Sequence, residues 1–218
     1  MIEVFYPKGC QVLQPKTTGR QARVLAEIGH SHMRNRPLDI WQRLRFMLRF
    51  TNSSLHAAIV KPDPSGGAMP LTAIQVARKI CEHGSWKITN LGLQKILYLA
   101  QMIFMGENNG ARLVDADFEA WDYGPVVPEI YRRVRMFGAN PIQDVFFGEP
   151  RPNDGLRQMS LHNVCTFLAG KKPGELVAIT HWKDGAWAKN YKPGSLGIAI
   201  PDEDILDEYR RRAEPRAA

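Results

Sequence analysis

The stretch Thr89-Asn-Leu-Gly-Leu-Gln-Lys-Ile-Leu-Tyr-Leu-Ala-Gln-Met-Ile-Phe-Met-Gly106 decides the fold. Apolar residues recur here at the spacing that places them on one face of a helix: Leu93, Ile96, Leu97, Ala100 and Phe104. Other apolar side chains cover most of the remaining faces, as is typical of a helix that lies inside a protein. Thr89 or Asn90 can cap its start, and Gly106 and Gly110 are expected to end it. The sequence therefore predicts a central core helix over about 90–106.

A second stretch, Phe118-Glu-Ala-Trp-Asp-Tyr-Gly-Pro-Val-Val-Pro-Glu-Ile-Tyr131, predicts a sharp corner. Its first six residues alternate and are rich in aromatics, which favours a short strand. Gly124 can adopt torsions that other residues avoid, and Pro125 fixes the turn after it. Pro128 suits the first position of the next helix, because its missing N–H is not needed there. We expect a rigid strand-to-helix corner.

Capping and stop signals outline four further helices. Thr72 and Gln75 form a capping box for a helix that Gly84 stops. Ser160 is expected to cap a helix ending near Gly170. Shorter helices are predicted over 175–181 and from Pro201 through Tyr209, with a turn around Trp187. The predicted fold is mainly α: a compact bundle of about six helices, including one after Pro128, with one short strand or hairpin around residues 118–123.

Positive charge is concentrated in the first third of the chain. Residues 1–68 hold 10 Lys+Arg and 4 Asp+Glu, a balance of +6, whereas residues 69–218 hold 19 and 18, a balance of +1. Within the first segment only 39–50 has helical patterning, as a short basic amphipathic helix. A linker of Pro, Ser and Gly follows at 61–68. Three interpretations stay open: a start mis-called upstream of Met69, a disordered tail, or a functional basic arm. Residues 69–212 are predicted to form the domain, with a tail at 213–218.

Several classes of function lack their sequence signals. No apolar run is long enough to span a membrane, and the N-terminus does not resemble a secretory signal. Cys10, Cys81 and Cys165 are isolated, which suggests buried thiols in a reducing cytoplasm rather than a zinc site or disulfides. Nucleotide-binding loops and zinc-protease motifs are missing from the sequence. We expect no cofactor, no metal and a cytoplasmic protein.

Three blocks resemble the Panacea family of SocA-like antitoxin domains. Residues 91–101 are similar to its LxLQKLLYFAQ helix, and residues 118–131 match its EAWxYGPVxPxxY corner almost letter for letter. Thr180-His181 with Trp187 is similar to its THxxxxPW turn, although Ala186 stands where the family usually has proline. That turn is therefore expected to be looser here. The motif residues expected to have structural roles are Gln94, Lys95, Tyr98, Gly124, Pro125, Pro128, His181 and Trp187.

The resemblance, which spans Met69 to about Tyr209, implies an antitoxin rather than an enzyme. Family members pair with unrelated toxins, commonly encoded next door and often in prophages. The SocA-like branch is described as delivering its toxin to the ClpXP protease. The implied partners are thus a cognate toxin and a ClpXP-type protease, with no membrane and with nucleic acid only through residues 1–68.

The corner supplies the candidate contact residues, because rigid aromatics beside arginine are favoured at protein-binding hot spots. They are Trp121, Tyr123, Tyr131, Arg132 and Arg135. An alternative for Trp121 and Tyr131 is that both belong to the core. Lys95 is expected to pair with Asp117, Glu119 or Asp122 and so fix its helix against the strand.

Two other functions remain as alternatives. One is a DNA-binding regulator of its own operon that acts through the basic residues 1–68. The other is a hydrolase using His181 and Asp184, although no activated serine or cysteine on a sharp turn accompanies them. His181 is more readily interpreted as a residue that caps or bridges neighbouring backbone.

Overall fold

The computed structural model describes residues 69–148, 150 and 154–214. Residues 1–68, with the predicted amphipathic helix at 39–50, and the tail from 215 lie outside the described residues. Seven α-helices run through the described part. They are α3 (Ala73–His83), α4 (Asn90–Glu107), α5 (Pro128–Val134), α6 (Gly155–Leu168), α7 (Pro173–Thr180), α8 (Ala186–Asn190) and α9 (Asp202–Ala213). The prediction of a mainly helical bundle is confirmed.

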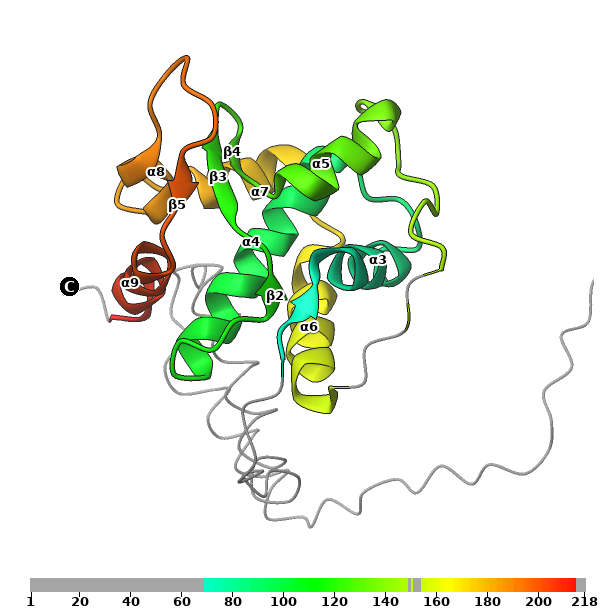
Figure 1. The fold of residues 1–218 in the computed structure, drawn as a ribbon, viewed down its shortest axis with the longest axis horizontal. Helices are drawn as coiled ribbons and strands as arrows, with labels where there is room; N and C mark the ends of the chain where they lie inside the picture. Colours follow the sequence, from blue (N-terminus) through cyan, green and yellow to red (C-terminus); the bar gives the residue numbers. More distant parts are fainter. Residues whose placement is uncertain (1–68, 149, 151–153, 215–218) are drawn as a thin grey trace, which may run out of the picture. The chain divides into compact units, whose positions relative to one another are not determined.

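Helix α4 is the centre of the fold, as its sequence predicts (Figure 1). It contacts α3, α5, α6, α7 and α9, and all but three of its residues are buried. Thr89 caps its start by accepting a hydrogen bond from Gly92 N. Gly106 does not end the helix. It lies in the last turn, where an added Cβ would come within 2.1 Å of the Tyr209 ring, so glycine allows α9 to pack closely.

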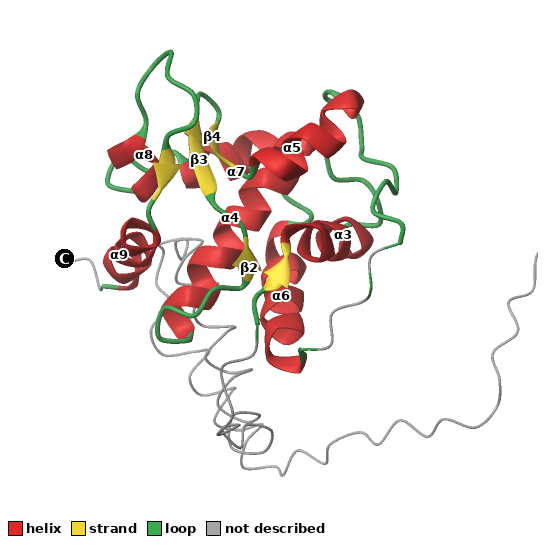
Figure 2. Ribbon diagram, in the orientation of Figure 1, coloured by secondary structure: helices red, strands yellow, loops and turns green. Residues whose placement is uncertain are grey.

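Short strands lie at two places in the fold (Figure 2). Strands β1 (Leu71–Thr72) and β2 (Val114–Asp115) are parallel. Strand β3 (Phe118–Trp121) is central in a second sheet, between β4 (Gly124–Val126) and β5 (Ala199–Ile200), and is antiparallel to both. The corner therefore contains a hairpin, with Trp121 opposite Gly124.

The predicted helix boundaries hold at most ends and fail at α6. The Thr72–Gln75 capping box and the Gly84 end of α3 are confirmed. Ser160 is not a cap: α6 begins at Gly155, where the Asp154 side chain accepts from Arg157 N. Ser160 instead lies buried within the helix. Because serine caps and buried small helical residues look alike in sequence, the upstream aspartate was the better signal.

The segment between α5 and α6 returns along α3. A 3₁₀ turn, η1 (Arg135–Phe137), ends at Gly138, whose φ is 55°. The chain then places Phe146 in the core, with its ring stacked 6.5 Å from that of Trp86. Among the described helices, none is long and apolar enough to cross a membrane.

Candidate partner-binding corner

The corner is built by a glycine and two prolines, as the sequence predicts. Gly124 has φ 94°, a value that side chains strongly disfavour. An added Cβ there would lie 2.9 Å from Lys95 Nζ and 3.0 Å from His181 Nε2. Pro125 continues β4, and Pro128 occupies the start of α5 after Val127. Gly124 is therefore required both by its backbone angle and by the side chains packed against it.

Helix α4 fastens this corner through two buried polar side chains. The Gln94 side-chain oxygen accepts from Val127 N at 2.9 Å, and its amide donates to Asn90 Oδ1 at 3.3 Å. Lys95 Nζ donates to the Pro125 carbonyl at 3.0 Å. Buried polar groups are costly unless they are hydrogen-bonded, so these bonds fix where β4 can lie. Gln94 and Lys95, which we expected to have structural roles, thus bind the backbone of Val127 and Pro125.

Lys95 does not make the ion pair that the sequence suggested. Its side chain is fully buried, at 0% exposure, and no carboxylate lies within ion-pair distance among the described residues. The acidic residues expected to pair with it have other partners: Asp117 binds Arg112, Glu119 binds Trp121 and Asp122 binds Tyr191. Burial without a counter-charge lowers the pKa of Lys95 to about 7.

The His181 and Trp187 rings stack beneath the corner, with centroids 3.9 Å apart. Trp187 Nε1 donates to the Trp121 carbonyl at 2.8 Å, which ties α8 to β3. Burial lowers the pKa of His181, as does the charge of Lys95, while a hydrogen bond with the Tyr123 backbone opposes the shift. His181 Nε2 is buried without a hydrogen-bond partner. The histidine ends α7 and has a hydrogen bond with the Tyr123 backbone.

Glu208 is the main residue of this region that sequence reasoning missed. It lies on α9 and is only 1% exposed, yet it accepts hydrogen bonds from three residues. Its donors are Tyr98 Oη at 2.6 Å, Ala186 N at 2.8 Å and the Arg212 guanidinium. Burial and the adjacent Glu208 carboxylate raise the pKa of Tyr98 well above its usual value. The signal was available: Glu208 follows the inward-facing Asp204 and Ile205 at helical spacing.

Ala186 has a specific role in this network. The sequence suggested a looser turn, because alanine replaces the usual proline before Trp187. In the structure Ala186 is buried and its N–H donates to Glu208, so this turn is held by a hydrogen bond. Proline has no N–H and could not make this bond.

Comparison with known proteins agrees with this arrangement of motifs. Residues 93–154 match the family model described as Antitoxin SocA-like, Panacea domain. Antitoxin SocA of Caulobacter vibrioides (strain NA1000 / CB15N) is 33% identical over 137 residues, 56% of this chain and 72% of the relative. This chain belongs to the SocA-like Panacea family. No solved structure matches it.

In this Panacea domain the predicted contact residues divide into a half-buried pair and an exposed set. Trp121 and Tyr131 meet edge to face at 4.8 Å, and both are half-buried. Trp121 Nε1 also donates to Glu119 at 2.8 Å. Tyr123 is 71% exposed, and Arg132 and Arg135 are exposed on α5 and η1. Trp121 and Tyr131 thus pack against each other within the corner, whereas the other three side chains are exposed to solvent.

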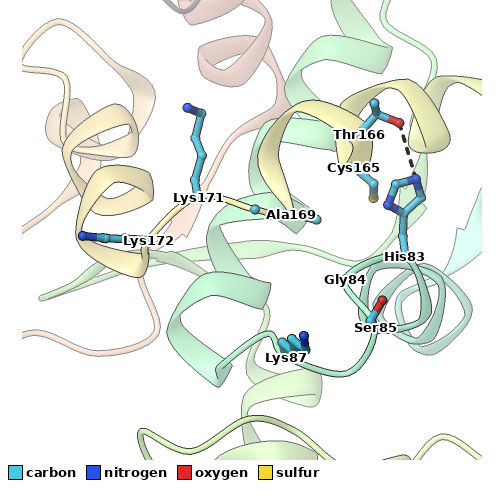
Figure 3. Close-up of a pocket in the computed structure, with 10 residues that line it drawn as sticks. His83, Gly84, Ser85, Lys87, Cys165, Thr166, Ala169, Lys171 and Lys172 are labelled. Carbon is cyan, nitrogen blue, oxygen red and sulfur yellow. Dashed lines mark hydrogen bonds between the residues drawn. The ribbon is translucent and has the colours of Figure 1, made fainter.

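The described residues do not assemble the hydrolase alternative. Between His181 and Asp184 there is no hydrogen bond or ion pair in this part of the chain, and Asp184 is exposed. A separate pocket lies between the end of α3 and α6, where Thr166 Oγ1 and His83 Nε2 are 3.4 Å apart (Figure 3). Burial raises the pKa of Cys165 in its wall to about 12, so that thiol is not a thiolate nucleophile. The described residues contain no group of three His, Cys, Asp or Glu side chains that could hold a metal ion.

Proposed function

We propose that this chain is an antitoxin that neutralises a cognate toxin protein by binding it directly, without catalysis, in the cytoplasm. The observation that carries the proposal is the 33% identity with Antitoxin SocA over 137 residues. The toxin is proposed to be the product of an adjacent gene, and a prophage is one setting in which such pairs are found.

The corner supports a binding role because its exposed side chains stand on a rigid base. Tyr123 lies in the turn between β3 and β4, and Arg132 lies on the helix that Pro128 starts. Buried hydrogen bonds from Gln94 and Lys95 hold the backbone between them. Tyrosine and arginine that are already ordered lose little entropy when a partner binds. We propose that Tyr123, Arg132 and Arg135 contact the toxin and that Trp121 and Tyr131 hold their positions.

Co-expression tests the proposal. The neighbouring gene is induced alone and together with this chain, and growth is measured. We expect growth arrest in the first case and growth in the second. The Tyr123→Ala variant should rescue growth less well, whereas Leu196→Ala, at another exposed apolar position, should rescue it fully. Equal growth arrest with and without the wild-type chain would overturn the proposal.

A finer mode of action follows from the family resemblance: delivery of the bound toxin to a ClpXP-type protease. The half-life of the toxin, measured in cells with and without the protease, tests this mode. Delivery predicts a half-life that this chain shortens only when the protease is present. A toxin that is neutralised but not degraded would reduce the proposal to masking.

A second candidate function, autoregulation through DNA binding, is favoured by the balance of +6 on residues 1–68. A salt-dependent shift of promoter DNA by the full chain would support it. The same assay with a chain that starts at Met69 locates the activity, because the remaining balance of +1 predicts no shift.

A further inference from the structure

A hollow on the outer side of α5 gathers apolar and cationic side chains. It is lined by Arg132, Arg133, Met136, Val145, Phe147 and Gly148. Met136 is 74% exposed and Phe147 is 76% exposed. Large apolar side chains that protrude together into one hollow are typical of an interaction site, whereas single ones are common on any surface.

The walls of the hollow are held in place from inside the protein. Phe146 is buried in the core, so the next residue, Phe147, is directed outward. The Asp144 side chain accepts from Phe146 N at 2.9 Å and forms an ion pair with Arg78 of α3. Met136 also lines the hollow. In the sequence it stands between Val134, which is buried, and Phe137, which packs against the core. A partner would therefore meet ordered apolar side chains, at a small cost in entropy.

The two arginines of the hollow form no ion pair with the described residues. Arg132 has no ion pair with any described residue, and Arg133 makes one contact, to the Val145 carbonyl at 3.5 Å. Elsewhere on the described chain, ion pairs with Asp or Glu are made by Arg78, Arg112, Arg157, Arg211 and Arg212. Two arginines that form no ion pair with the described residues, beside an apolar lining, complement a segment that carries both carboxylates and apolar side chains.

We propose that this hollow binds an acidic segment of the toxin, in which carboxylates lie beside two or more apolar side chains. The inference rests on the proposed function, because it identifies where and by what chemistry the toxin is held. A protein segment is favoured over nucleic acid because the hollow is lined by the apolar side chains of Met136, Val145 and Phe147. In addition, residues 69–218 carry a balance of only +1.

Calorimetric titration of the full chain with the purified toxin tests the inference. Arg132→Glu and Met136→Ser should each weaken the affinity by about tenfold or more, since both would be hot-spot residues. Added salt should reduce the loss for Arg132→Glu, because salt screens repulsion between the new carboxylate and the acidic segment, and should leave the loss for Met136→Ser unchanged. The matched control is Arg210→Glu, an exposed arginine on α9. It should bind as the wild type does.

The outcomes separate the inference from the proposed function. If the wild-type chain does not bind the toxin, the proposed function fails. If the wild type binds and both hollow variants bind equally well, the inference alone is overturned. An affinity for DNA that Arg132→Glu abolishes, with toxin binding intact, would also overturn it. Far-UV circular dichroism of each variant verifies that the exposed substitutions leave the fold unchanged.

Discussion

Most polar side chains of α4 are buried and hydrogen-bonded, whereas those on the outer face of α5 are exposed to solvent. On α4, Gln94, Lys95 and Tyr98 are buried and each binds a defined atom elsewhere in the domain. On α5, Arg132 is exposed and has no ion pair among the described residues. These three side chains belong to the motif block at residues 91–101, whereas Arg132 follows the block at 118–131. The buried motif residues thus fix the shape of the corner, and we propose that the adjacent exposed surface selects the partner.

This difference fits the proposed role, in which the domain binds a toxin protein through an exposed surface. A buried hydrogen bond tolerates little change, because removing one partner leaves the other unsatisfied. An exposed arginine or methionine can be replaced with little effect on folding. The domain can therefore keep one scaffold while its contact surface varies, and the predictions below test this division.

The largest effect on stability is expected for Glu208→Ala. The substitution leaves Tyr98, Arg212 and the Ala186 N–H without their buried acceptor. Loss of one member of a buried charged network costs about 3–5 kcal/mol. Chemical denaturation should show that decrease in the free energy of unfolding. A decrease below about 1 kcal/mol would show that water replaces the carboxylate and that the network is not structural.

The next largest effect on stability is expected for Gly124→Ala. An alanine at φ 94° is strained, and its Cβ would crowd Lys95 Nζ. We expect a loss of about 1–3 kcal/mol in the free energy of unfolding. The matched control is Gly174→Ala, since a Cβ at Gly174 meets no atom within 4 Å and the residue lies in α7. A control that destabilises as strongly as Gly124→Ala would contradict the packing of the corner.

Lys95 predicts a dependence of stability on pH. Its pKa is about 7 in the folded protein and 10.5 without burial, so between these values the unfolded chain binds more protons. Stability should therefore rise with pH above 7, by about 1 kcal/mol per pH unit near pH 7.5–8. The buried thiols Cys81 and Cys165 oppose this trend from about pH 8 upward, because burial raises their pKa from 9.0 and only the unfolded chain releases these protons there. In Lys95→Met the rise should disappear, and a rise that persists would contradict the burial of an unpaired lysine.

Ala186→Pro is expected to have the smallest of these effects on stability. Proline suits the first turn of α8 but removes the N–H that binds Glu208. The lost hydrogen bond outweighs the gain from a stiffer unfolded chain, and the net loss should be about 1 kcal/mol. Thermal unfolding measures it. A stabilised variant would show that the Ala186 N–H is dispensable.

Much of the fold follows from short-range signals, whereas most of the site does not. The position of α4 could be predicted because its apolar residues cover nearly every face. Gly124, Pro125 and Pro128 predicted the corner because each restricts the backbone by itself. The partners of Lys95 and Glu208 depend on residues far apart in sequence, and no local pattern specifies them. Phe147 and Met136 were missed because exposure is determined by how the chain packs.

The affinities of Ser160→Ala and Arg132→Glu for the toxin, measured side by side, test the division between scaffold and contact surface most directly. Ser160→Ala changes a buried side chain of α6 that does not line the hollow, so its affinity should lie within about twofold of the wild type. Arg132→Glu changes only the exposed face and should lose tenfold or more. A folded Ser160→Ala variant that loses the toxin, beside an Arg132→Glu variant that retains it, would contradict the account.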